Sequence, residues 1–303
     1  MEMVVIGAGA IGSFVAAGLA RNGGSVTLVA RGSRLEWLRD NPVEIESAGS
    51  TEYIRVAAAR WAELTRPANL AIICTKTPEL PDVLRDLAAH LAPAAVVVTL
   101  QNGVEAPYAA AGALPDAAIV AGRFHGFFDM IGQRVRHVGV PSSINFGCIG
   151  GPAQQAERLV AGALEAAGIA HAISPDIVTA LWEKFMLASS VGGLSVAWGV
   201  NAGQVTGIPD GEIMLRAAMH EVATLARSFG AKLGGTDVDQ TLDFVRSFPE
   251  RVTTSLQRDI EAGRPSEYDA VVGAVIRLAG AKHLPVPAFS EIDRLARSRY
   301  PAI

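Results

Sequence analysis

Residues 4–14 read VVIGAGAIGSF, and this stretch decides the fold of the chain. Its first three residues form a short apolar run, which is typical of a buried parallel strand. Gly7, Gly9 and Gly12 follow in the spacing G-x-G-x-x-G, and the apolar residues after them recur at helical intervals. A glycine motif between a strand and a helix is the context of the dinucleotide-binding fingerprint. The opening of the chain therefore predicts a cofactor site.

The residues of this motif have separate roles in such a site. Gly7 permits the tight turn, Gly9 lets the backbone approach a pyrophosphate, and Gly12 lets the helix pack closely on the strand. The start of the helix, at Ala10 and Ile11, offers free N–H groups and a partial positive charge. We therefore expect these five residues to bind the phosphates of a dinucleotide.

The motif begins a longer alternation of strands and helices. Strands are expected at residues 25–29, 43–45, 53–57, 70–74, 95–100 and 169–173, antiparallel strands within 119–146, and helices at 33–40, 78–91 and 153–167. Ser33 is expected to cap the helix that it begins. Such alternation predicts parallel strands with helical crossovers, which is a doubly wound α/β sheet of the Rossmann type.

The pattern changes after Ser174 and Pro175. Residues 176–191 form one long helical pattern, and helical patterns continue to the C-terminus. We therefore expect two domains, an NADP-binding Rossmann-type domain over residues 1–174 and an all-helical substrate domain over residues 175–303. Ligands of open α/β sheets bind beyond the carboxyl ends of the strands, so a second domain that closes over this edge predicts a substrate cleft.

The composition of the 303 residues excludes several classes of protein. Hydrophobic residues make up 50% of the chain, which supports a substantial core, and the net charge of −4 gives no reason to expect nucleic acid. No apolar run reaches the roughly 18 residues of a membrane span, and the chain begins directly with a strand, so neither a membrane segment nor a signal peptide is expected. Cys74 and Cys148 lie in apolar segments, and no Cys/His cluster has metal-ligand spacing. We expect reduced, buried thiols, no metal and a cytoplasmic protein.

The end of the second expected strand indicates which dinucleotide is bound. An NAD site normally has an acidic residue there, to bond the ribose hydroxyls. Here the strand ends at Arg31, and the next charged residue is Arg34. Because a guanidinium can grip phosphate oxygens with two donors, the pattern favours NADP, although a solvated surface arginine has the same sequence signal. Lys76 follows the next apolar strand, and two interpretations of it remain: a ligand-binding lysine at the edge of the sheet, or an ordinary surface lysine.

Polar residues that could reach a substrate lie farther along the chain. Asn102 follows a buried strand in QNG, which is a turn signal as well as a place for a ligand-binding amide. Glu267 precedes an apolar helix and is a second candidate. Ser266 and Asp269 resemble a capping pair for that helix, so Glu267 could instead be an acidic residue of the first turn that the helix dipole stabilises. His125 is a candidate for the cleft.

Lys184 is more informative. On a helical wheel, the five apolar residues Ile177, Ala180, Leu181, Ala188 and Val191 fall within roughly 60° of it. Lys184 therefore lies on an apolar face, and a lysine there either snorkels to a structural carboxylate or loses hydration. Desolvation lowers the pKa of a lysine, which suits it to act as a general acid at neutral pH.

Taken together, the chain resembles the ketopantoate reductase (2-dehydropantoate 2-reductase) family. The resemblance covers nearly the whole length, and its most specific motifs are LWEKF around Lys184 and SLQRDIEAGRPSEYDAVVGAV from Ser255 onward. It implies NADPH-dependent reduction of ketopantoate, as in pantothenate biosynthesis, with Lys184 as proton donor and Glu267 as substrate-binding and network residue. It further implies that Ser255 contacts the substrate carboxylate, that Asn102 binds both cofactor and substrate, and that Arg31 and Lys76 hold the NADP phosphate.

The chain departs from the family pattern at two positions. Family members carry asparagines one and two turns after the catalytic lysine, where this chain has Ala188 and Gly192. Residues 123–125 also replace small hydroxyl residues. Because a site without polar partners binds a polar substrate poorly, we expect a 2-keto acid other than ketopantoate. The alternatives are a β-hydroxyacid-type dehydrogenase and a non-catalytic NADP sensor, and a homodimer is an open expectation.

Overall fold

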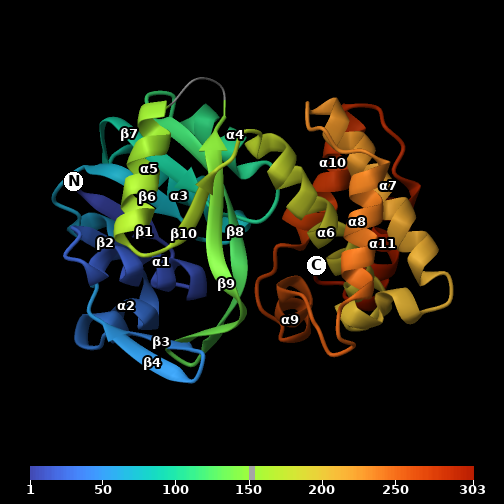
Figure 1. Ribbon diagram of the computed structural model, residues 1–303, viewed down its shortest axis with the longest axis horizontal. Coiled ribbons are helices and arrows are strands. Elements are labelled where there is room, and N and C mark those ends of the chain that lie inside the picture. The colour runs from blue at the N-terminus through green and yellow to red at the C-terminus, as the bar shows by residue number, and fades with distance from the viewer. Residues whose placement is uncertain (150–153) are drawn as a thin grey trace. The chain divides into compact units, whose positions relative to one another are not determined.

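The computed structural model describes residues 1–149 and 154–303, and the chain divides into two compact units. The first unit comprises Met1–Gln101 and Glu105–Ile177, and the second comprises Asn102–Val104 and Val178–Ile303. The first is an α/β unit and the second is helical (Figure 1). The predicted fold class, a doubly wound sheet followed by an all-helical region, is confirmed.

The first unit is built on one sheet of ten strands. The strands are β1 (Met3–Ile6), β2 (Val26–Val29), β3 (Val43–Ser47), β4 (Ser50–Ile54), β5 (Ala57–Ala59), β6 (Ala68–Ile73), β7 (Leu91–Thr99), β8 (Ala118–Ile131), β9 (Arg134–Cys148) and β10 (Ala170–Ile173). Their order is β4-β3-β9-β8-β7-β6-β1-β2-β5, with β10 paired to β9. Strands β8, β7, β6, β1, β2 and β5 run parallel, so their carboxyl ends share one edge. Strands β8 and β9 form the expected antiparallel ribbon.

Helices cover both faces of this sheet. The helices of the first unit are α1 (Ala10–Arg21), α2 (Gly32–Asp40), α3 (Leu80–Ala88), α4 (Ala106–Ala113) and α5 (Gln154–Ala166). Buried residues of α1, α2 and α5 pack in one core with Val5, and those of α3 and α4 pack in another core with Val4 and Ile6. Consecutive residues of a strand point to opposite faces, so a continuous apolar run such as β1 supplies both cores.

Several predicted boundaries differ from the structure. The helix expected to reach Leu91 ends at Ala88, and Leu91 instead begins β7 and pairs with Ala68. Pro93 explains the difference, because proline has no N–H for a continuing helix. Ser33 does not cap α2, since the cap position is Arg31 and no side chain bonds there. The expected helix start at residue 153 lies outside the described residues.

The second unit consists of helices. These are α6 (Ile177–Trp198), α7 (Gly211–Ser228), α8 (Gly235–Arg246), α9 (Ser255–Glu261), α10 (Ala274–Ala281) and α11 (Pro287–Arg299), with the short turns η3 (Ala202–Gly207) and η4 (Asp269–Gly273). The turn η4 is one turn of π-helix. Helix α6 is longer than predicted, and most of its residues from Trp182 to Ala197 are buried.

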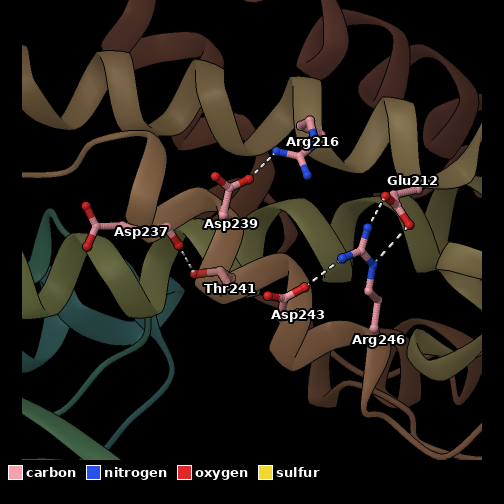
Figure 2. Close-up of polar contacts among 7 residues, drawn as sticks. All are labelled: Glu212, Arg216, Asp237, Asp239, Thr241, Asp243 and Arg246. Carbon is pink, nitrogen blue, oxygen red and sulfur yellow. Dashed lines mark hydrogen bonds and ion pairs between the residues drawn. The ribbon is translucent and has the colours of Figure 1, made fainter.

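Ion pairs tie α7 to α8 on the surface of this unit (Figure 2). Arg246 of α8 bonds to Glu212 of α7 and to Asp243 of its own helix, and Arg216 of α7 bonds to Asp239 of α8. The Arg246 guanidinium lowers the pKa of Glu212 by its hydrogen bonds. All of these side chains are solvated, so each pair contributes little stability. Within the described part of the chain, no helix combines the length and apolar character that crossing a bilayer requires.

Candidate functional site

The glycine motif forms a strand–turn–helix unit at the shared edge of the parallel strands. Gly7 has φ +101°, a conformation that side chains rarely adopt, and its N–H donates to Val29 O over 3.1 Å. A Cβ on Gly12 would lie 1.9 Å from Gly7 O, so only glycine permits this helix–strand contact. Gly9 is exposed, and a Cβ there would meet nothing within 4 Å. The first turn of α1 at Ala10 and Ile11 holds no acidic residue that would repel an anion.

Arg31 and Lys76 follow β2 and β6 at the same edge. Arg31 is exposed, and its Nη2 lies 3.1 Å from Glu79 Oε1, so the structure pairs it with a carboxylate. Lys76 is half-buried and precedes the short 3₁₀ turn η2 (Thr77–Glu79), at its N-cap. The ion pair joins the segments that follow β2 and β6, and both basic side chains lie at the same end of the sheet.

Arg34, the next charged residue after Arg31, has different surroundings. The Arg34 guanidinium bonds to Ala8 O, to Ser13 Oγ and to Gln133, which are all in the first unit. Desolvation lowers the pKa of Arg34, and the charge of Glu44 opposes that shift. The sequence analysis counted Arg34 only as a nearby arginine that favours NADP, and in the structure its guanidinium donates to these oxygens of the first unit.

Two buried polar groups at this edge were missed by the sequence analysis. Gln101 is only 7% exposed, and among the described residues neither its Oε1 nor its Nε2 has a hydrogen-bond partner. Thr75 Oγ1, just after the neighbouring strand β6, is also buried and has no hydrogen-bond partner among the described residues. Buried polar groups are normally paired, so these atoms suit a polar ligand such as a dinucleotide. The sequence signal was present, because both residues follow predicted strands directly.

In the second unit, Asn102 and Glu267 are joined. Asn102 Nδ2 donates to Glu267 Oε2 over 2.8 Å, although 165 positions separate the two residues. Gly103, with φ +98°, continues the turn, and a Cβ on it would lie 3.2 Å from Ala270 O of η4. The close approach of this turn to η4 keeps the amide and the carboxylate in contact.

Glu267 lies just before the π-helical turn. Its carbonyl oxygen accepts from Val271 N over 2.9 Å. The expected capping pair is wrong, because Ser266 Oγ accepts from Tyr268 N and Asp269 instead pairs with Arg277. Single turns of π-helix are frequent at functional sites, since they change the direction of neighbouring side chains.

Lys184 lies on α6 between buried neighbours. Leu181, Trp182 and Phe185 are buried, whereas Lys184 and Ala188 are half-buried. Ile177, Leu181 and Val191, which the helical wheel predicted to share an apolar face, are buried. Lys184 is partly exposed, which agrees with a side chain at the margin of this apolar face of α6. Ala188 and Gly192 follow Lys184 at intervals of four residues, so the three residues form one line along the same side of α6.

The start of α9 packs against this line. A Cβ on Gly192 would lie 3.5 Å from Leu256 Cδ2 and 3.9 Å from Thr254 Oγ1. Ser255 lies between these two residues, is exposed, and begins α9, whose N-cap hydroxyl at Thr254 accepts from Gln257 N. A Cβ on Gly193 would lie 3.2 Å from Val272 Cγ2 of η4. Helix α6 therefore packs against α9, which begins at Ser255, and against η4, which follows Glu267.

The remaining sequence candidates have ordinary surroundings. Phe124 is buried in an aromatic cluster with Phe14 and Phe128. His125 is exposed on β8, opposite Ser143. Burial raises the pKa of the Cys74 thiol to about 12, and burial with the nearby Glu157 raises that of Cys148 to about 11. Among the described residues neither cysteine forms a disulfide, and each is only partly enclosed, whereas the sequence predicted buried thiols. Among residues 1–149 and 154–303, no three His, Cys, Asp or Glu side chains are placed to hold a metal ion.

Comparison with known proteins identifies relatives over the full length. Residues 3–151 match the family model described as ketopantoate reductase PanE/ApbA, and residues 176–299 match its C-terminal counterpart. A 2-dehydropantoate 2-reductase of Mesorhizobium japonicum is 28% identical, over 98% of this chain and 97% of that protein.

Solved structures give the same result. A PanE/ApbA family ketopantoate reductase from Ralstonia eutropha JMP134 superposes with a TM-score of 0.89 at 27% identity, and the match covers 99% of each chain. A D-mandelate dehydrogenase solved with NADH and anilino(oxo)acetate has a TM-score of 0.89 over 100% of this chain and 99% of that one, at 20% identity. At that identity the second likeness concerns the fold alone.

Proposed function

Because the chain belongs to the ketopantoate reductase family, we propose that it reduces a small 2-keto acid to the 2-hydroxy acid with NADPH. The enzymes of this family are nicotinamide-dependent oxidoreductases that act on CH–OH groups, and this chain is one of them. The observation that carries the proposal is the Asn102–Glu267 hydrogen bond in the same unit as the half-buried Lys184. Cofactor binding is assigned to residues 1–174, and substrate binding and catalysis to residues 175–303 together with Asn102.

The cofactor side of the proposal rests on the glycine loop. Gly9, Ala10, Ile11 and Gly12 present backbone N–H groups to the pyrophosphate, whereas Gly7 forms the turn and donates its own N–H to Val29 O. A nicotinamide cofactor, when bound, supplies the hydride. Arg31 and Lys76 supply positive charge for the 2′-phosphate, and the end of β2 has no acidic residue for a ribose hydroxyl. The unpartnered atoms of Thr75 and Gln101 fit a polar group at this edge.

The chemical side rests on Lys184. Reduction of a ketone places negative charge on the carbonyl oxygen, and a protonated lysine at that oxygen supplies both charge and a proton. Glu267 accepts a hydrogen bond from a substrate hydroxyl. It also accepts a hydrogen bond from Asn102 Nδ2, which keeps the side-chain amide of Asn102 oriented. Ser255 offers an exposed hydroxyl to the substrate carboxylate.

Ala188 and Gly192 support a substrate other than ketopantoate. Neither residue can hydrogen-bond through its side chain, and a Cβ on Gly192 would meet, outside its own helix backbone and among the described residues, Leu256 Cδ2 and Thr254 Oγ1. A pocket lined this way binds apolar substituents better than a hydroxyl that needs a partner. We propose a branched or otherwise apolar 2-keto acid as the preferred substrate. A homodimer and a cytoplasmic location stay predictions.

The test is NADPH oxidation by the purified protein across a panel of 2-keto acids that includes ketopantoate. We expect steady turnover, with a higher kcat/KM for an apolar branched substrate than for ketopantoate. Ketopantoate as the best of a broad panel would contradict the substrate proposal. Absence of turnover with every member, with NADPH binding retained, would favour the alternative of a cofactor-sensing protein. Turnover confined to 3-hydroxy acids in the oxidative direction would favour a β-hydroxyacid-type dehydrogenase.

A further inference from the structure

Arg34 of α2 joins three separate segments of the first unit. Its Nε donates to Ala8 O over 3.2 Å, and its Nη2 donates to Ser13 Oγ over 3.0 Å. Its Nη1 donates to both Gln133 O and Gln133 Oε1, over 2.8 and 2.9 Å. The segments are the glycine loop, helix α1, and the turn between β8 and β9 (Figure 1). The four acceptors are neutral oxygens, so none of these bonds is an ion pair.

The bond to Ala8 O orients the next peptide N–H. Ser13, which is fully buried, also donates from Oγ to Ala8 O over 3.2 Å, so two donors hold this carbonyl. In a planar trans peptide the carbonyl of one residue and the N–H of the next point in opposite directions. Because Ala8 O points toward Arg34 and Ser13, the N–H of Gly9 points away from them.

Gly9 is the place where this orientation has an effect. It is the exposed N-cap of α1, and in the described part of the chain its N–H has no hydrogen-bond partner. A Cβ at Gly9 would meet open space, so a ligand can approach the backbone closely. Free N–H groups at a helix N-terminus bind anions.

We propose that Arg34 is a positioning residue that holds the glycine loop ready for the pyrophosphate of the cofactor. It acts through the Ala8 carbonyl and the Gly9 N–H, with Ser13 and Gln133 as its supports. The proposal rests on the proposed function, because it presupposes that a dinucleotide binds this loop. It also assigns Arg34 a role different from that of Arg31, since four of the five guanidinium N–H donors of Arg34 already have acceptors.

The two roles differ in a measurable way. A ligand of the 2′-phosphate contributes to NADPH binding and not to NADH binding, because NADH lacks that group. A residue that positions the loop contributes equally to both, because both cofactors carry the pyrophosphate. Comparison of the two dissociation constants therefore separates positioning from direct contact.

The experiment measures the Kd of NADPH and of NADH for wild type and for Arg34→Gln, Arg34→Lys and Gln133→Ala by titration. For Arg34→Gln we expect both Kd values to rise by the same factor, about tenfold to hundredfold, which corresponds to the loss of hydrogen bonds to a charged group. Arg34→Lys retains the charge but not the fork, so we expect a smaller equal rise. Gln133→Ala leaves Arg34 in place and removes one acceptor, so its effect is the smallest.

The matched control is Arg39→Gln. Arg39 lies on the same helix α2 and pairs with exposed Glu63. Its substitution removes an arginine from α2 and leaves the contacts of Arg34 with the glycine loop in place. We expect both Kd values to be unchanged. Melting temperatures without cofactor identify any variant that is merely unfolded, in which case Arg34→Lys and Gln133→Ala carry the test.

Three outcomes would overturn the proposal. A rise confined to NADPH would make Arg34 a 2′-phosphate ligand, and unchanged affinities would make it a structural residue only. An equal effect of Arg39→Gln would assign the loss to helix α2 as a whole. If wild type binds neither cofactor, the proposed function itself fails, which is distinct from all of these results.

Discussion

At the scale of single residues, Lys184 is the side chain on which the proposed chemistry depends. Lys184→Ala removes the proton donor, so we expect hydride transfer to slow by about 10²–10⁴-fold. NADPH affinity should not change, because the phosphate-binding residues lie in the other unit. Lys184→Arg should also fail, since a guanidinium does not give up its proton and has a different shape. The measurement is single-turnover hydride transfer at saturating cofactor.

The control for Lys184 is Lys282→Ala. Lys282 is exposed and lies 4.7 Å above the ring centroid of Phe229, in the same unit but with no assigned role in the reaction. Its loss should leave the single-turnover rate unchanged. If Lys184→Ala slowed the chemistry by less than about tenfold, Lys184 would be a structural lysine whose stem packs on α6.

We propose that Arg31 decides the choice between the two nicotinamide cofactors. Arg31→Ala should weaken NADPH binding by about 1.5–3 kcal/mol, the range for hydrogen bonds to charged groups, and leave NADH binding unchanged. Because Glu79 pairs with Arg31 over 3.1 Å, Glu79→Gln should free the guanidinium and strengthen NADPH binding. Calorimetric titration with both cofactors measures these changes. Equal or tighter binding of NADH by the wild-type protein would refute the preference for NADP.

How far the sequence predicts the site also depends on the residue. The spacing of Gly7 and Gly12 predicts their conformation and packing, because glycine is required at both for local reasons. The contact between Asn102 and Glu267 is not predictable from spacing, since it joins segments that are far apart in the chain and depends on tertiary packing. The bonds of Arg34 were not predictable either, because its partner Gln133 belongs to a turn 99 positions away.

At the scale of elements, we propose that Ala188 and Gly192 of α6 determine which 2-keto acid is preferred. The double variant Ala188→Asn with Gly192→Asn places two amides on the line that begins at Lys184. A side chain fits at Gly192, since its Cβ would make only ordinary contacts at 3.5 and 3.9 Å. We expect the ratio of kcat/KM for ketopantoate to that for the best apolar substrate to rise at least about tenfold, since a lost hydrogen bond to substrate costs at least that much in discrimination. The substrate panel measures this ratio.

The neighbouring glycine provides a contrast on the same helix. A Cβ on Gly193 would lie only 3.0 Å from Ile292 Cγ2, so Gly193→Ala should destabilise the unit, whereas Gly192→Ala should be tolerated. An unchanged substrate ratio in the double asparagine variant, with the fold intact, would show that these two positions do not face the substrate.

Elements were predicted well in kind and less well in their limits. Continuous apolar runs identify β1, β6 and β7 because each supplies two cores. The start of β7 was missed because the helical periodicity of α3 runs on past its true end. The π-helical turn η4 could not be foreseen, since its apolar residues fit an α-helical pattern equally well and its geometry arises from packing against α6 and the turn at Gly103.

At the scale of the whole molecule, the two thiols report on the integrity of the fold. The raised pKa values of Cys74 and Cys148, about 12 and about 11, leave almost no thiolate at neutral pH. We therefore expect slow reaction with a thiol reagent in the native protein and rapid reaction of both cysteines in denaturant. The same shifts make the fold less stable as pH rises above about 9, because the unfolded chain then releases protons that the native protein retains. Thiol counting and denaturant melts between pH 7 and 10 measure both effects. Rapid native labelling at pH 7 would contradict this prediction.

The three residues Asn102–Val104 belong to the second unit, while the chain on either side of them belongs to the first. A ribosome therefore makes Asn102 long before Glu267, the residue to which it bonds across 165 positions. At a synthesis rate of about 5–20 residues per second, roughly 8–33 s separate the synthesis of Asn102 from that of Glu267. The helical unit is complete only when this earlier segment has joined it, so a fragment that begins at Val178 would lack Asn102. A gene cut at the apparent domain boundary would thus yield a helical piece without part of its own site.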